Sequence, residues 1–388
     1  KKGRPVCILV VSGPYKEIAY FDDEMFTEIA QVDHVIDQQE TRALGRHLNH
    51  FLKLHGLEKD QHQWDTFYEN HTLEQLHGVA IFWVALSFWI RGQFNWDQSI
   101  QDWVYSHFAA LVDQKDVAQA VLDVSAMGSV GLPLPERLLP ESGSGWPMSQ
   151  LLDDERPRLG ILGLTRVSAR GERYWALIHD VIGRLILNAV FYDYKTRETL
   201  ELTDSDDAEH LRFYILRRIS SKKQLAEREF REIGEEFATS IFKIDPESGY
   251  SHFAPYWQEV LEALDSMPRP LQDNSRVFRH HVAISRRRIS YMDSKTYGPT
   301  LQQRKHLLEA AISDIEYALY SIEFHPGTEP NLNLYNSLAR AYLDLGEVER
   351  DLGAQEERIR SLQASANEAT KRAYRENPSN SYVIETYV

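Results

Sequence analysis

The feature that most constrains the fold is a helical periodicity that fills the C-terminal half of the chain. From about Asp204 to the end, apolar residues recur at the spacing of one face of an α-helix. Asp, Pro, Gly and Asn residues interrupt this spacing and predict where successive helices end. The predicted helices are 206–223, 225–242, 251–267, 273–292, 300–323, 331–345 and 347–376. We therefore expect a mainly α-helical protein.

Length and charge narrow the classes of function. The chain has 388 residues, and domains of roughly 150 residues would make two or three of them. Its 43 basic and 58 acidic residues give a net charge of −15. An acidic chain has no long-range attraction to phosphate backbones, so a dedicated nucleic-acid binder is disfavoured. The single cysteine, Cys7, cannot form an internal disulfide, which indicates a reducing compartment such as the cytoplasm.

The N-terminal third begins with a short strand and continues with helices. Val6–Val11 is an apolar, β-branched run that ends at Ser12, which is typical of a buried strand in a parallel sheet. One strand cannot form a sheet, so we expect the chain to be a piece of a longer one. Residues 37–108 have helical spacing. Within them, Val79–Ile90 is only 12 residues long. Since a membrane span needs about 20 residues, this segment is predicted to be a buried helix.

Residues 113–190 change from helical spacing to a predicted β-hairpin. Asp116–Ala126 and Met148–Leu159 are predicted helices, and a short helix is expected to begin within Leu132–Glu136. Residues 164–169 and 174–178 then form two extended runs that flank Arg170-Gly171-Glu172, where the glycine favours a turn. A last helix begins at about Asp180. This order of helices and hairpin is that of a winged-helix domain.

The last third of the chain contains a segment similar to a helical repeat. Asn336–Glu347 has small residues where helices must approach closely, with Tyr342 and Leu345 between them and Gly346 predicted to turn the chain. This segment resembles the first helix of a tetratricopeptide repeat. Alanines followed by Asn377–Asn380 resemble the end of its second helix; these alanines are Ala366, Ala369 and Ala373. The spacing exceeds the usual repeat of about 34 residues, so the array is expected to be degenerate.

The chain carries no recognisable catalytic or metal-binding signature. It has no G-x-x-x-x-G-K-[ST] phosphate loop, no H-E-x-x-H and no C-x-x-C. Cys7 is interpreted as a small buried residue rather than a nucleophile. Several histidines have irregular spacing on or near a polar helix and are interpreted as surface residues: His47, His50, His55 and His62. We therefore predict no catalytic residue and no metal site.

The densest basic run, Arg286-Arg287-Arg288, follows His280-His281. It is interpreted as a solvated face of a helix. A contact with an acidic partner or a nucleic acid is the alternative.

One histidine stands where a binding residue is expected. His179 joins the end of the predicted hairpin to the next helix, and Asp180 can cap that helix. Since a helix N-terminus favours negative charge, a histidine there can donate a hydrogen bond to an anion. A purely structural histidine at this joint remains the alternative.

The order of these features resembles STAND-class signalling NTPases, which include the plant NLR resistance proteins. Ile178-His179-Asp180 is similar to the Met-His-Asp motif of that class, with Ile178 in place of the methionine. In those proteins the histidine contacts the β-phosphate of ADP and keeps the protein off. The resemblance thus implies that His179 binds nucleotide. It also implies that Ser12 stands at the end of the last core strand, where the class carries a polar or arginine sensor.

The resemblance also implies a domain order along the chain. It predicts the end of the nucleotide-binding core at 1–36, a helical lid at 37–112 and a winged helix at 113–190. A helical sensor follows at 191–388 and is tetratricopeptide-like from about residue 300. Three expected features of the class are absent. They are the phosphate-binding Walker motifs, which would lie upstream, an arginine after the strand, where Ser12-Gly13-Pro14 stands, and a clear Gly-Leu-Pro motif in the lid, since Gly131-Leu132-Pro133 occurs later.

Such a protein is expected to be a switch in bacterial antiviral or related immune signalling. ADP would hold it off, and ATP with Mg²⁺, bound mostly by upstream residues, would drive formation of a homo-oligomer that activates a separate effector domain. The helical sensor would bind a protein ligand. This portion alone is not expected to be catalytic, and neither a membrane nor a nucleic acid is an expected partner.

Two further functions remain as alternatives. The first is a helical-repeat adaptor that binds a protein partner without any nucleotide. The second is a transcription regulator, which is disfavoured because the predicted helix Met148–Leu159 carries Asp153, Asp154 and Glu155, where DNA recognition needs basic side chains.

Overall fold

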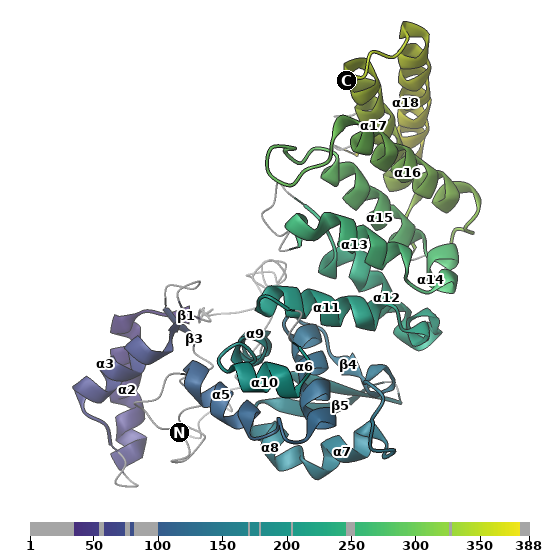
Figure 1. Ribbon diagram of the computed structural model, residues 1–388. Coiled ribbons are helices and arrows are strands. Elements are labelled where there is room, and N and C mark those ends of the chain that lie inside the picture. The colour runs from purple at the N-terminus through teal and green to yellow at the C-terminus, as the bar shows by residue number, and fades with distance from the viewer. Residues whose placement is uncertain are drawn as a thin grey trace, which may run out of the picture. The chain divides into compact units, whose positions relative to one another are not determined.

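In the computed structural model, the described residues are 35–53, 58–73, 78–80, 100–169, 171–177, 180–202, 205–245, 253–325 and 328–380. The chain divides into two compact units, Lys1–Trp103 and Val104–Val388. Most of the described residues are in helices (Figure 1), which confirms the predicted mainly α-helical class. The strand predicted at Val6–Val11 lies outside the described residues.

The first unit contains two packed helices and a small antiparallel sheet. Helix α2 (Gln38–Leu52) packs on α3 (Gln61–His71). The contact requires Gly45, because a Cβ at this position would lie 2.5 Å from the indole ring of Trp64. Arg42 ties the same two helices together by donating to both carboxylate oxygens of Asp65, at 2.7 and 3.0 Å.

The sheet of the first unit was not expected from the sequence. Its strands are β1 (Val35–Ile36), β2 (Thr72–Leu73) and β3 (Gly78–Ala80), in the order β1-β3-β2. The helix predicted at Val79–Ile90 is wrong at its start, since Val79 lies in β3, paired with Ile36 on one side and Thr72 on the other. A β-branched residue fits this central position well. Residues 81–90 lie outside the described part of the chain.

The second unit begins with helices around a three-stranded antiparallel sheet. Its elements, in chain order after α5 (Ile100–Ala109), are α6 (Lys115–Gly128), β4 (Leu134–Pro135), the 3₁₀ turn η3 (Glu136–Leu138), α7 (Met148–Asp154), α8 (Arg156–Ile161), β5 (Leu164–Ala169), β6 (Glu172–Leu177), α9 (Asp180–Ala189) and α10 (Tyr194–Thr199). The predicted hairpin is confirmed: β5 and β6 pair from Leu164 opposite Leu177 to Ala169 opposite Glu172.

Two details of this region differ from expectation. The short helix expected within Leu132–Glu136 begins only at Glu136, because Leu134–Pro135 forms β4 and pairs with β6. The single helix expected at Met148–Leu159 is two helices that separate at Glu155. Pro157 lies in the first turn of α8, where a proline is tolerated, whereas inside a continuous helix it would remove a backbone hydrogen bond.

In the described part of the rest of the second unit, all secondary-structure elements are helices or helical turns. The elements are α11 (Ala208–Ser220), η4 (Lys223–Ala226), η5 (Arg228–Phe230), α12 (Arg231–Glu236), the π-helical turn η6 (Phe237–Ile241), η7 (Ala254–Tyr256), α13 (Trp257–Asp265), α14 (Arg269–Asn274), α15 (Arg276–Ile289), α16 (Leu301–Tyr320), α17 (Asn331–Asp351) and α18 (Glu356–Glu376). Helices α15 to α18 each pack on the next along the chain (Figure 1). Leucine, isoleucine, valine and alanine side chains fill the core between them.

The predicted turn at Gly346 is wrong. Helix α17 continues through this residue to Asp351, and the chain turns at Gly353, which adopts a positive φ of 79°. Gly346 is instead buried inside the helix, where a Cβ would lie 4.0 Å from Cβ of Leu362 in α18. None of the helices in the described part of the chain is long and apolar enough to cross a membrane.

Candidate functional site

The two residues predicted to bind nucleotide, His179 and Ser12, lie outside the described residues, so their contacts stay predictions. The chain on both sides of His179 is described, since β6 ends at Leu177 and α9 begins at Asp180. Leu177 and Asp180 are therefore the described residues nearest to His179, and together they form its frame.

Close packing of α6 against α9 sets this frame. Leu177 lies at the contact: a Cβ on Gly128 of α6 would lie 2.4 Å from its Cδ1, and one on Gly183 of α9 would lie 2.8 Å away. A Cβ on Gly183 would also lie 2.5 Å from the carbonyl oxygen of Ser125. Only glycine permits this approach, so packing holds the end of β6 and the start of α9 at a defined separation.

Charged side chains gather at the beginning of α9. Asp180 is the first residue of the helix and lies 3.9 Å from Arg184, one turn later. Arg212 of α11 is 3% exposed, forms an ion pair with Glu209 at 2.5 Å and lies over the ring of Phe253. Burial, aided by the positive charge of Arg184, lowers the pKa of Arg212. The sequence predicted Asp180 as the helix cap, but the N-cap position precedes it and is not described.

An ion pair with a buried carboxylate joins this region to the helices that follow. Asp123 of α6 is fully buried, and Arg218 of α11 donates a hydrogen bond to its Oδ1. Burial raises the pKa of Asp123 to about 6, although the positive charges of Arg218 and Lys222 oppose the shift. The other oxygen, Oδ2, has no hydrogen-bond partner. A carboxylate that depends on one strong donor is a weak point in the contact between two helices.

A family described as novel STAND NTPase 7 matches residues 1–290. The chain belongs to this family of STAND NTPases. The matched residues include α6, the hairpin, α9 and α11, and therefore the whole frame around His179. The resemblance to STAND-class signalling NTPases is thereby confirmed at the level of the family. No curated protein and no solved structure matches the chain.

The basic run on α15 of this STAND NTPase is not a solvated face, contrary to the interpretation from the sequence. Each arginine of the run binds an acidic side chain from another segment, and the preceding Arg279 does the same. The ion pairs are Arg279–Asp314 and Arg286–Asp314 at 2.7 Å, Arg287–Asp344 at 3.1 Å and Arg288–Asp245 at 2.7 Å. The run therefore connects α15 to α16, to α17 and to the segment that follows η6, and its charge is neutralised within the protein.

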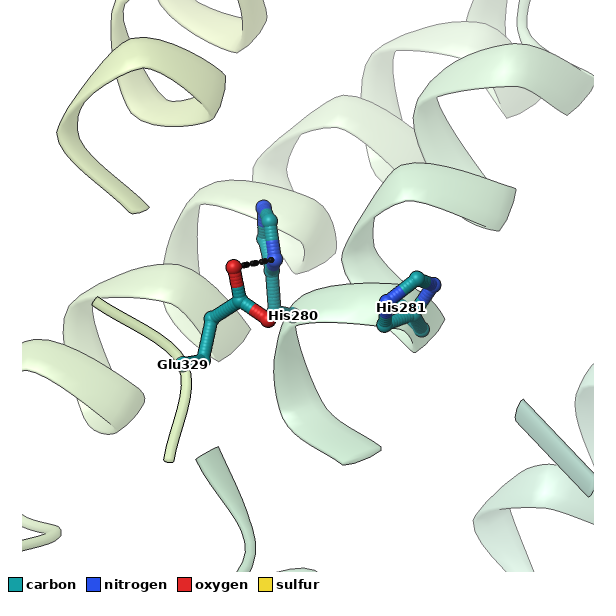
Figure 2. A group of neighbouring side chains, drawn as sticks. All are labelled: His280, His281 and Glu329. Atoms are coloured by element: carbon teal, nitrogen blue, oxygen red, sulfur yellow. Dashed lines mark ion pairs between the residues drawn. The ribbon is translucent and has the colours of Figure 1, made fainter. Parts of the chain in front are cut away.

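Next to this run lies a group that the sequence did not predict. Figure 2 shows His280 facing Glu329, with His281 beside them on the same helix. Among the described residues, these three form the one group of histidine, cysteine and acidic side chains close enough to share a metal ion. Burial is the largest cause that lowers the pKa of His281, to about 4, so its imidazole is neutral at neutral pH.

Long-range partners explain why the sequence did not predict these sites. Arg218 lies 95 positions from Asp123 in the chain. The only local signal is an aspartate in the otherwise apolar and small-residue stretch of α6, where a charged residue needs a partner. His280 and Glu329 come from different elements, and their spacing matches no metal motif. By contrast, His47, His50 and His62 are exposed, as the sequence predicted.

Proposed function

We propose that this chain is the regulatory and ligand-sensing portion of a STAND NTPase switch in immune or antiviral defence. ADP holds the parent protein off, and exchange for ATP with Mg²⁺ drives a homo-oligomer that activates a separate effector in the cytoplasm. The observation that carries the proposal is the element order α6, β4, α7, α8, β5, β6 and α9 in a member of this family. We interpret that order as a winged helix that presents His179 at its last strand–helix joint.

The surroundings of His179 suit a phosphate group. The residue immediately precedes a helix, and helix N-termini favour anions. Arg184 lies on the first turns of that helix and is close enough to Arg212 to affect its pKa. Both guanidiniums have acidic partners, Asp180 for Arg184 and Glu209 for Arg212, so the helix N-terminus is the feature that favours the β-phosphate of ADP. Ser12 is proposed to lie at the same nucleotide, at the end of the last core strand.

The helices from α11 onward are proposed to form the sensor, tetratricopeptide-like near its end, that binds a protein ligand. The aromatic side chains on these helices differ in availability. Tyr320 is 62% exposed, and its hydroxyl accepts a hydrogen bond from Arg372 at 3.1 Å. The ring of Tyr317 is covered by the guanidinium of Arg279 at 4.8 Å and that of Tyr335 by the guanidinium of Arg372 at 5.8 Å. We therefore assign ligand contact to Tyr320, and packing to Tyr317 and Tyr335.

The test is the substitution His179→Ala in the parent protein that contains the upstream nucleotide-binding residues. A contact made only in the ADP-bound state stabilises that state by its own free energy. A charge-assisted hydrogen bond contributes about 1.5–3 kcal/mol, so its loss shifts the off/on ratio roughly ten- to a hundredfold. We expect higher effector output without ligand and less ADP retained after purification.

The matched control is His306→Ala, which removes an exposed histidine from α16 and should change neither readout. If His179→Ala retains ADP like the wild type and stays silent, the switch role of His179 is wrong. If the parent protein binds neither ADP nor ATP, the chain acts instead as a helical adaptor for a protein partner.

A further inference from the structure

One ring nitrogen of His280 has a hydrogen-bond partner, and the other has none. It lies on α15, is 5% exposed, and its Nε2 lies 2.7 Å from the hydroxyl oxygen of Ser337 on α17. Its Nδ1 is buried, makes no hydrogen bond and lies 3.3 Å from Oε1 of Glu329. When Nε2 donates its proton to Ser337, Nδ1 presents a lone pair toward a carboxylate oxygen. Two electron-rich atoms then face each other in a buried site.

The distance between these two atoms is compatible with a metal ion that both of them bind. A charge-assisted N–H···O hydrogen bond is about 2.7–2.9 Å long, shorter than the 3.3 Å seen here. Nitrogen and oxygen ligands lie about 2.0–2.2 Å from zinc, so two ligands at a tetrahedral angle lie about 3.3–3.5 Å apart. The separation of Nδ1 and Oε1 therefore fits two ligands of one zinc ion.

His281 supplies a third ligand of the right kind. One ligand atom from each of the three residues lies within 4.8 Å of the other two. A ring nitrogen of histidine is a common zinc ligand. Rotation of the His281 side chain toward His280 and Glu329 in Figure 2 would place its ring nitrogen at a third corner of the zinc tetrahedron.

The charges around the group are compatible with a cation. Lys243 and Arg288 are the neighbouring positive groups that affect His281. Both form ion pairs with Asp245, Arg288 at 2.7 Å and Lys243 at 3.9 Å, so their repulsion of a metal ion is reduced. Glu329 contributes the negative charge of the site itself.

We propose that His280, His281 and Glu329 bind a Zn²⁺ ion that fastens α15 to the segment leading into α17. A water molecule takes the fourth position. Ser337 fixes the ring of His280 through Nε2 and thereby directs Nδ1 to the metal, the role that hydrogen-bond partners of ligating histidines commonly have. The ion would add a further contact between α15 and the segment before α17 to the apolar core and the ion pairs of the array.

The experiment measures zinc binding to the full 388-residue chain after removal of metal with a chelator. Calorimetry should show one Zn²⁺ per chain, and Co²⁺ should give the intense visible absorption of a tetrahedral site. The conservative variants His281→Gln and Glu329→Gln should each weaken binding at least tenfold. The control His306→Gln removes an exposed histidine that lies 3.6 Å from Glu309, and should bind like the wild type.

A milder variant separates loss of the site from loss of the fold. Ser337→Ala keeps all three ligands and removes only the group that orients His280, so its zinc affinity should fall about ten- to a hundredfold. Zinc should raise the melting temperature of the wild type and of His306→Gln, and should not raise that of Glu329→Gln. Absence of stoichiometric binding in the wild type, or binding that Glu329→Gln and His281→Gln leave unchanged, would overturn the proposal.

Discussion

The hairpin-bearing region and the array of α15 to α18 bury charge in different ways. In the first, the carboxylate of Asp123 is completely buried and depends on Arg218 as its one strong donor. In the second, Asp314 is 5% exposed and receives hydrogen bonds from both Arg279 and Arg286. Those two arginines have further partners of their own, Asp273 and Asp265 respectively.

The two regions differ in how many partners their buried charged groups have. When one member of a shared network is removed, the remaining members still have partners, whereas a single buried pair leaves an uncompensated charge. Among charged groups, the contact of α6 with α11 therefore depends on one critical ion pair, whereas the array has several weaker ion pairs.

The largest effect is expected from Arg218→Ala. The substitution leaves Asp123 buried without its donor, which costs about 3 kcal/mol of unfolding free energy at pH 8. This is the lower end of the range for buried pairs, because the side chain of Arg218 is 36% exposed and Lys222 remains nearby. The control Arg217→Ala breaks an exposed pair with Glu262 and should cost less than about 1 kcal/mol.

The effect of Arg218→Ala should depend on pH. The folded-state pKa of Asp123 is raised from 3.8 to about 6, so between these values the folded protein holds a proton that the unfolded chain has lost. Stability therefore falls as pH rises through this window. Without Arg218 the pKa rises further and the fall continues above pH 6. Urea denaturation should thus show a large difference from wild type at pH 8 and a small one at pH 5; an equal difference at both values would contradict this account.

A smaller loss of stability is expected from a substitution at the backbone contact between α6 and α9. In Gly183→Ala the new Cβ would lie 2.5 Å from the Ser125 carbonyl oxygen and 3.1 Å from the Ser129 nitrogen, so α6 and α9 must separate. Such overpacking costs about 2 kcal/mol and should appear as a lower melting temperature. Gly160→Ala in α8 is the control, because its Cβ would meet nothing within 4 Å. It should be neutral or stabilising; equal losses in the two variants would show that the close approach of α6 and α9 is unimportant.

The smallest effect is expected from Asp314→Asn in the array. The amide keeps the shape and one acceptor oxygen, and Arg279 and Arg286 keep their other partners, so the loss should be about 1 kcal/mol. Asp351→Asn, at the exposed end of α17, should change stability by less than about 0.5 kcal/mol. If Asp314→Asn costs more than Arg218→Ala in the same denaturation experiment, the network is not redundant and the comparison fails.

What the sequence by itself determined is what local patterns encode. The helical spacing after about residue 204 and the glycine between the two extended runs predicted the array and the β5–β6 hairpin, because periodicity and turn chemistry act within a few residues. The order of these elements together with Ile178-His179-Asp180 was enough to indicate the family. At Val79 the local pattern suited both a helix and a strand, and at Gly346 it suited both a turn and a helix. The prediction failed at both residues, because strand pairing and helix continuation depend on neighbours far away in the chain.

Only the tertiary structure decided which charged groups meet. Arg286–Arg288 have the composition of a solvated helix face, yet acids from α16, α17 and the segment after η6 neutralise them. Asp123 and Arg218 are 95 residues apart, and His280 meets Glu329 through the packing of α15 beside the segment before α17. A side chain's type specifies what partner it needs but not where that partner lies, since the partner is brought close only when apolar and glycine contacts have set the distance between helices.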